Sequence, residues 1–151
     1  MVDKNTKKIF LNSASKKQWS KIGVRRKAGI LIPLFSIYSQ KSLGIGEFGD
    51  LKLFVDWCVK TGNSIIQLLP LNETGMFCPY DSESSFALEP VYISLRLLPS
   101  AGNKDSSGKL KAIQDKFPAG GPHVNYGIKK EKLGFLWKCF LEKRQAKKEN
   151  F

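Results

Sequence analysis

Residues 64–95, SIIQLLPLNETGMFCPYDSESSFALEPVYISL, join an apolar strand directly to a loop rich in Pro, Ser and Tyr. The apolar part, residues 64–71, shows no alternation of period two and is followed by Asn72. That pattern is typical of a strand covered on both faces in a parallel sheet. Loops after such strands carry binding chemistry in many α/β proteins. The segment therefore predicts an α/β fold with a functional loop after Leu71.

The residues before this segment predict a strand, a loop and a helix. Residues 28–34, AGILIPL, are an apolar run of strand length, and residues 35–49 are rich in Ser, Gln and Gly, as loops are. Asp50 can cap a helix that ends at Gly62. Apolar residues recur along it at helical spacing: Leu51, Phe54, Val55, Cys58 and Val59. With the following strand, these elements predict a right-handed βαβ unit whose helix packs on the sheet.

The rest of the chain divides by composition. Residues 1–27 predict a basic, mobile or peripheral N-terminal extension, and residues 28–98 hold the first βα units. Residues 99–128 are rich in Gly, Pro, Ser and Lys and predict a surface connection with one or two helical turns. Residues 129–151 predict an amphipathic basic helix and tail, with five apolar residues on one side: Leu133, Leu136, Trp137, Phe140 and Leu141. Trp57 and Trp137 are expected in the core or in an interface.

Charge is concentrated at the two ends of the chain. The formal net charge of +12 suggests nucleic acid or an anionic membrane as a partner. Residues 1–27 hold nine basic residues and one acidic, and residues 129–151 hold eight and three, whereas residues 28–128 hold eight and nine. A basic module that binds nucleic acid or a membrane is therefore an alternative only for residues 1–27 and 129–151. Steeply salt-dependent binding through these residues would identify it. We expect neither partner, because aromatic and basic residues do not interleave there.

Cysteine usage and hydropathy predict a soluble cytoplasmic protein. Cys58, Cys78 and Cys139 are odd in number and far apart, as in proteins of reducing compartments. The N-terminal sequence lacks the apolar core of a signal peptide, and no apolar run approaches the roughly 18 residues of a membrane span. His123 is the single histidine, so no metal site is expected. Because His123 lies in a Gly-Pro loop, we expect a structural hydrogen bond there, not a general base.

Residues 44–49, GIGEFG, satisfy the dinucleotide-binding pattern and precede a helix. In that motif the first glycine forms the tight turn at the end of the strand, so that pyrophosphate reaches the helix N-terminus. Here about nine residues separate Leu34 from Gly44. We therefore interpret the segment as a turn that positions the helix.

Five short motifs occur in the order found at the start of the amylomaltase family. They are AGILIPLFSIYS (28–39), LGIGEFGDL (43–51), IIQLLPLNETG (65–75), CPYDSESSFALEPVYISL (78–95) and FPAGGPHVNYGIKKEKL (117–133). Over roughly residues 28–133 the chain therefore resembles the N-terminal part of a 4-alpha-glucanotransferase.

The resemblance implies a fold and an activity. The fold is an incomplete N-terminal part of a (β/α)8 barrel, because a whole barrel takes about 250 residues. The activity is retaining transfer of α-1,4-glucan segments between maltooligosaccharides, without a cofactor. The aspartate nucleophile, glutamate acid/base and third carboxylate of the family can be assigned to no residue here. We therefore expect the isolated chain to be inactive, with exposed apolar strand edges that associate with a complementary polypeptide.

Tyr80, in the motif Cys78-Pro79-Tyr80, is the main candidate for substrate binding. A pyranose exposes an apolar C–H face edged by hydroxyls, and a tyrosine offers a flat ring and a phenolic hydrogen bond. The resemblance places Tyr80 at the tyrosine that packs against the sugar at the cleavage site. Cys78, Asp81 and Ser84 are further substrate-binding candidates. A buried tyrosine held by its hydroxyl is the alternative.

Two positions depart from the family pattern, in which serine is usual at Cys78 and asparagine at Glu89. A thiol is a weak donor, so a sugar contact at Cys78 would be weakened, and Glu89 is expected to cap or orient the following strand. Asp81 and Glu83 raise the idea of a retaining carboxylate pair, which needs a separation of about 5 to 5.5 Å. A serine-rich loop does not hold side chains so rigidly, and we expect solvated acids.

The nearly neutral central part of the chain suits an uncharged glucan. The main alternative from another functional class is a noncatalytic carbohydrate-binding or interaction remnant. Maltooligosaccharide binding without catalysis, lost on Tyr80→Ala, would identify it.

Overall fold

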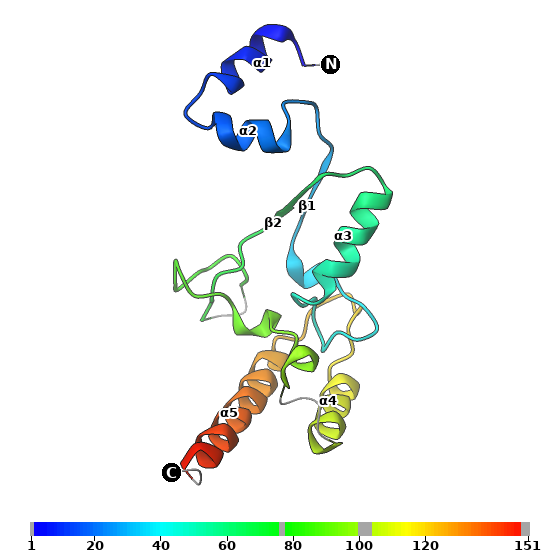
Figure 1. The fold of residues 1–151 in the computed structure, drawn as a ribbon. Helices are drawn as coiled ribbons and strands as arrows, with labels where there is room; N and C mark the ends of the chain where they lie inside the picture. The colour runs from blue at the N-terminus through cyan, green and yellow to red at the C-terminus, as the bar shows by residue number, and fades with distance from the viewer. Residues whose placement is uncertain (1, 76–77, 100–103, 149–151) are drawn as a thin grey trace.

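A computed structural model describes residues 2–75, 78–99 and 104–148 (Figure 1). The chain has a mixed α/β fold with a small parallel sheet. Its elements, in order, are α1 (Lys4–Leu11), α2 (Lys16–Ile22), β1 (Gly29–Ile32), the 3-10 helix η1 (Leu34–Ser36), α3 (Asp50–Lys60), β2 (Ile65–Leu68), the 3-10 helices η2 (Pro90–Tyr92) and η3 (Leu95–Leu97), α4 (Lys104–Lys116) and α5 (Gly127–Lys148).

The βαβ unit forms with the expected parallel pairing. Gly29 lies opposite Ile65, and Ile32 lies opposite Leu68. The expectation that β2 is covered on both faces is wrong, because Ile65 is 47% exposed and Leu31 on the neighbouring strand is 60% exposed. In the described residues the sheet has two strands, and the face that carries Leu31 and Ile65 is open to solvent.

Helix α3 begins and ends close to the predicted residues, but Asp50 does not cap it. Its carboxylate points to the loop before the helix, where it accepts hydrogen bonds from the Glu47 backbone N–H at 2.9 Å and the Ser42 hydroxyl at 2.8 Å. Only part of the predicted apolar face is covered. Cys58 is buried and Leu51 and Phe54 pack against the core, whereas two residues are exposed: Val55 and Val59.

Residues 99–128 contain a longer helix than the sequence predicts. Helix α4 has 13 residues instead of one or two turns. Leu110, Ile113 and Phe117 follow at intervals of three and four residues, and all three are buried in the core. The residues around these three are polar, so the sequence did not predict the full length of the helix, which tertiary packing stabilises.

Helix α5 buries a different face from the predicted one. Ile128, Lys132 and Phe135 are buried, and α5 packs against η2. Four of the five residues expected to form its apolar side are exposed: Leu133, Trp137, Phe140 and Leu141. Of the two alternatives for the tryptophans, the core is excluded, because Trp57 is 49% and Trp137 is 61% exposed, and a place in an interface stays a prediction. The buried face contains a lysine, so an apolar pattern could not identify it.

The N-terminal helices lie apart from this core. Figure 1 shows α1 and α2 at the opposite end of the molecule from α4 and α5. They contact each other through Phe10 and Trp19, whose ring centroids are 4.5 Å apart, and neither helix has a buried residue. No helix in the described ranges has the length and apolar character needed to cross a bilayer.

The core lies beyond the carboxyl ends of the two strands. It is built from the loop after β1, the segment around η2 and η3, and helices α4 and α5. Its buried members are Leu34, Ile37, Leu43, Ile45, Val91, Tyr92, Leu95, Leu110, Ile113, Phe117, Ile128 and Phe135.

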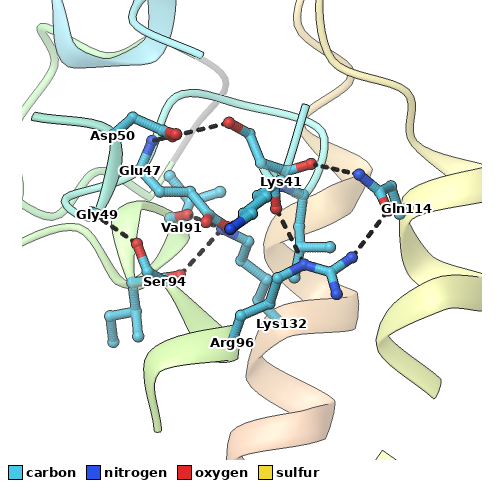
Figure 2. Close-up of polar contacts among 12 residues, drawn as sticks. Lys41, Glu47, Gly49, Asp50, Val91, Ser94, Arg96, Gln114 and Lys132 are labelled. Carbon is cyan, nitrogen blue, oxygen red and sulfur yellow. Dashed lines mark hydrogen bonds and ion pairs between the residues drawn. The ribbon is translucent and has the colours of Figure 1, made fainter. Parts of the chain in front are cut away.

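Lys132 on α5 is fully buried within this core (Figure 2). Its ammonium donates to Glu47 Oε1 at 2.5 Å, to the Val91 carbonyl at 2.6 Å and to the Ile93 carbonyl at 3.1 Å. Three segments that are distant in sequence therefore meet at one nitrogen atom. The Gly49 N–H bonds to Ser94 Oγ at 2.7 Å and ties the same loop to the same segment.

Helix α4 is tied to this region through Arg96 and Gln114. Arg96 donates to the Lys41 carbonyl at 3.0 Å and to Gln114 Oε1 at 2.8 Å. Gln114 in turn donates to the Gln40 carbonyl at 2.7 Å. The loop after β1 is thus held by polar contacts from both C-terminal helices.

Burial shifts the pKa of each member of the Lys132–Glu47 pair in the direction that favours its neutral form. Desolvation raises the pKa of Glu47, and the nearby Asp50 adds to this rise, while the charge of Lys132 opposes it. Desolvation likewise lowers the pKa of Lys132, against the attraction of Glu47. Each charge therefore stabilises the other, because either charge alone would be strongly unfavourable in this buried environment.

Replacing Lys132 with Met should lower the free energy of unfolding by about 3–5 kcal/mol, because Glu47 is left buried without its cation. The double variant Lys132→Met/Glu47→Met should lose less, since no unpaired charge remains. Urea unfolding measures both. Lys130→Met, on the exposed side of the same helix, is the control and should change stability by less than about 0.5 kcal/mol.

The Lys132→Met loss should also depend on pH. Burial holds the pKa of Glu47 above its unfolded value, so the folded state favours the protonated acid, and stability is lost as the pH rises through the raised pKa. The variant should therefore be less destabilised near pH 4 than near pH 7. A loss that is equal at both pH values, or a double variant at least as destabilised as Lys132→Met alone, would contradict a buried ion pair.

Candidate functional site

The loop after β2 is closed at its base by backbone pairing. Asn72 forms an antiparallel bridge with Leu88, and Thr74 forms one with Ser82. The Glu73 N–H also bonds to the Ala87 carbonyl at 2.9 Å. This loop, residues 72–89, leaves the carboxyl end of β2 and carries all four predicted substrate-binding residues.

Glu89 locks the base of this loop. One carboxylate oxygen, Oε2, accepts from the Thr74 N–H at 3.0 Å and from the Lys129 ammonium at 3.0 Å, and the other accepts from the Val91 N–H at 3.3 Å. Lys129 also donates to the Thr74 carbonyl at 2.7 Å. The expectation that Glu89 caps the next element is confirmed, although that element is the 3-10 helix η2, not a strand. The glutamate fixes both ends of the loop to α5.

Tyr80 is accessible at the tip of the loop. It is 51% exposed, so the alternative of a buried tyrosine is wrong. Cys78 and Asp81 are exposed, and Ser84 is half-buried. The Ser84 hydroxyl accepts from the Phe86 N–H at 3.3 Å and from the Ala87 N–H at 3.0 Å, which stabilises the local turn. Of the four candidates, Ser84 is the one whose side chain has a clear role within the loop itself.

Asp81 and Glu83 lack the environment of a catalytic pair. Both side chains are exposed. The Glu83 carboxylate lies over Gly75, where a Cβ atom would come within 1.7 Å of its Oε1. The general acid of a retaining pair depends on an apolar pocket. The expectation of solvated loop acids is therefore confirmed.

The segment of residues 44–49 serves packing. Residues 44–47 are all buried, and a Cβ atom at Gly46 would come within 2.1 Å of the Leu34 carbonyl oxygen. The backbone approaches η1 so closely that only glycine fits. This agrees with the interpretation of a turn that positions α3.

A cavity of about 360 Å³ lies beside the loop that carries Tyr80. Its walls come from three places: residues 35–45 after β1, Pro79 from the loop, and residues 118–126 before α5. His123 is exposed and lines this cavity. The described residues form no hydrogen bond to its ring, so the structural bond expected there stays a prediction.

Tyr126 lines the cavity and Tyr92 lies in the neighbouring core, and the pKa values of both phenols are raised. Desolvation raises the pKa of Tyr126, and the charges of Tyr80 and Cys78 raise it further. Desolvation likewise raises the pKa of Tyr92, with Tyr126, Glu89 and Tyr80 adding to the rise. The phenols of Tyr92 and Tyr126 thus remain protonated near neutral pH and can donate hydrogen bonds.

Sequence reasoning missed the contribution of the C-terminal third. The sequence predicts a surface connection over residues 99–128 but not that residues 118–126 form one wall of the cavity. Lys129 was expected to belong to a solvated face, yet it holds the base of the loop. The closely spaced His123 and Tyr126 in a Gly-Pro context were the available signal for the cavity wall.

Comparison with known proteins gives a consistent family. A family model described as 4-alpha-glucanotransferase matches residues 32–151. The 4-alpha-glucanotransferase of Chlamydia pneumoniae is 45% identical over 136 residues, which cover 87% of this chain and 25% of that protein. The 4-alpha-glucanotransferase DPE2 of Oryza sativa subsp. japonica is 47% identical over 100 residues, which cover 60% of this chain and 11% of that protein.

The 4-alpha-glucanotransferase of Clostridium butyricum is 33% identical over 111 residues, which cover 72% of this chain and 22% of that protein. The chain therefore spans a quarter or less of the length of these relatives. Because the family model matches most of this chain, and matches it across both the loop and the cavity walls, the chain belongs to the 4-alpha-glucanotransferase family.

Proposed function

We propose that this chain forms one wall of the donor-sugar site of a 4-alpha-glucanotransferase. The single observation that carries the proposal is the position of Tyr80, half-exposed on a loop that is locked at its base and borders a cavity. In this role the Tyr80 ring packs against the apolar face of a glucosyl unit. Cys78, Asp81 and Ser84 line the same loop and contact the sugar hydroxyls.

The reaction proposed for the complete protein is transfer of an α-1,4-glucan segment between maltooligosaccharides with retention. In such a reaction one carboxylate attacks the anomeric carbon while an acid protonates the leaving oxygen, and the acceptor hydroxyl then displaces the enzyme. We assign none of these carboxylates to this chain. The acids nearest Tyr80 in sequence are Asp81 and Glu83, and both are exposed to solvent. Their exposure supports leaving the catalytic carboxylates unassigned in this chain. Alone, the chain should therefore bind glucan without transferring it.

The proposed architecture is the N-terminal part of a (β/α)8 barrel. A parallel βαβ unit is its building block, and a functional loop at the carboxyl end of a strand is where barrels place their sites. Leu31 and Ile65 leave apolar surface on the open face of the sheet. We propose that further strands and helices of the barrel, on the same or a complementary polypeptide, cover this face.

A noncatalytic carbohydrate-binding remnant is the second candidate. It is favoured by one specific feature, which is that the Tyr80 loop is fixed by Glu89 and Lys129 within this chain and needs no other segment to hold its base. The two candidates share the sugar site and differ in whether catalytic acids are supplied from elsewhere.

Titrating the chain with maltotriose should reveal binding that Tyr80→Ala weakens by about tenfold or more, equivalent to at least ~1.4 kcal/mol. Tyr80→Phe keeps the ring and should retain most of the affinity. Phe86→Ala is the matched control, because Phe86 is an aromatic residue of the same loop that is 96% exposed. Binding that persists in Tyr80→Ala, or that falls equally in Phe86→Ala, would refute the proposed site.

Incubation of the pure chain with maltotriose should release no glucose, because the proposed catalytic carboxylates are not among its residues. A coupled glucose assay measures this, with a complete 4-alpha-glucanotransferase as the positive control. Sustained glucose release that disappears in Asp81→Asn or Glu83→Gln would overturn the proposal and identify these acids as catalytic.

A further inference from the structure

We propose that the cavity between the loop after β1, helix α3 and the 3-10 helix η3 binds a small phosphate monoester whose organic part carries hydroxyl groups. The cavity has a volume of about 310 Å³, within the range of small-molecule sites, about 300–1,000 Å³. It shares no lining residue with the cavity beside the Tyr80 loop. The inference is therefore independent of the proposed glucan site and assigns a different ligand to a different part of the chain.

Three cationic side chains from three separate segments line this cavity. They are Lys41 on the loop after β1, Lys52 on α3 and Arg96 on η3. None of the ion pairs in the described part of the chain includes any of them. Glu47 also lines the cavity, but its charge is balanced by Lys132. Because like charges without counterions repel one another, a bound phosphate would stabilise this arrangement through charge-assisted hydrogen bonds.

Arg96 is held in place by neutral partners and keeps its charge for a ligand. The residue is half-buried, and its guanidinium donates to the Lys41 carbonyl at 3.0 Å and to Gln114 Oε1 at 2.8 Å (Figure 2). These bonds orient the planar guanidinium, which has five N–H donors in all. The donors that remain can bind two oxygens of one phosphate, a geometry for which arginine is well suited.

Two nearly buried polar side chains complete the site. Ser94 is 9% exposed, and its Oγ accepts from the Gly49 N–H at 2.7 Å, while its own proton has no acceptor among the described residues. Asp50 is 6% exposed and accepts its two hydrogen bonds through Oδ2. No polar side-chain atom of the described residues is both enclosed and unbonded, so Oδ1 of Asp50 faces the open cavity that this residue lines. The cavity thus offers a hydroxyl donor for a phosphate oxygen and a carboxylate acceptor for a ligand hydroxyl.

The rest of the lining suits the organic part of such an ester. Residues 49–56 of the chain form the side of the cavity along α3, where the exposed Asp56 lies one helical turn beyond Lys52. Leu53 and Leu97 add apolar surface for C–H groups. Inorganic phosphate would leave the two aspartates and the two leucines without a partner, and an uncharged polyol would leave the three cations uncompensated. A phosphorylated polyol matches both parts of the lining.

Titration of the chain with D-glucose 6-phosphate by isothermal titration calorimetry tests this site. The ester should bind at least about tenfold more tightly than inorganic phosphate. Lys41→Gln and Lys52→Gln should each weaken its binding about fivefold or more, because each removes one charge-assisted hydrogen bond. Both lysines are exposed and their ammonium groups bond to no described residue, so these variants should fold normally. Lys60→Gln, at an exposed position of α3 outside the lining, is the matched control and should change the affinity less than about twofold.

Asp56→Ala separates the two parts of the ligand. It should weaken binding of glucose 6-phosphate about threefold or more, because an acceptor for the sugar hydroxyls is lost. It should not weaken binding of inorganic phosphate, which does not use that acceptor and gains from removal of a nearby negative charge. Equal weakening of both ligands would refute the assigned orientation and with it the proposed site.

Competition with maltotriose separates this site from the proposed glucan site. Excess maltotriose should not displace glucose 6-phosphate, because the two cavities have no lining residue in common. Displacement, a loss in Lys60→Gln equal to that in Lys52→Gln, or inorganic phosphate binding as tightly as the ester would refute the phosphate-ester site. If the chain binds glucose 6-phosphate as expected but no maltotriose, the proposed function fails and this site stands. If it binds maltotriose alone, this site fails and the proposed function stands.

Discussion

The buried ammonium of Lys132 is the interaction on which the arrangement of this chain depends. It satisfies its charge and its three donors with Glu47 and the carbonyls of Val91 and Ile93, so the loop after β1 and the segment around η2 are fixed to α5. A buried charge with one partner removed is strongly unfavourable, whereas a fully bonded one selects a single packing of the segments around it. The network in Figure 2 therefore acts as the structural centre of a small core.

Helix α5 also fixes the base of the candidate site. Lys129 lies one turn before Lys132 on α5 and holds the carboxylate of Glu89 together with the carbonyl of Thr74. Two lysines at adjacent positions of one helical face thus fix the base of the Tyr80 loop and the segment that follows it. Loop, cavity wall and core are consequently coupled through α5.

The sequence predicts the local elements well and the long-range contacts poorly. The strand at Ile65–Leu68, the helix at Asp50–Lys60 and their parallel connection follow from apolar runs and breakers that lie close together. The buried face of α5 could not be predicted, because a lysine in the sequence indicates an exposed position. Lys132 is buried only because folding brings it to Glu47, which is 85 residues away. Likewise Tyr80 was identified from its motif, whereas the cavity depends on residues around Gly120 that only the folded chain places next to it.

Native-state hydrogen exchange at the amide of Phe48 tests the central role of the Lys132 network most directly. This amide donates to the Tyr92 carbonyl at 2.9 Å and joins the two segments that Lys132 holds. It should exchange only through global unfolding, with an opening free energy equal to that of the whole core. Exchange of the Phe48 amide as fast as that of amides in α1, whose residues are not buried, would show that these segments separate freely and would contradict the account.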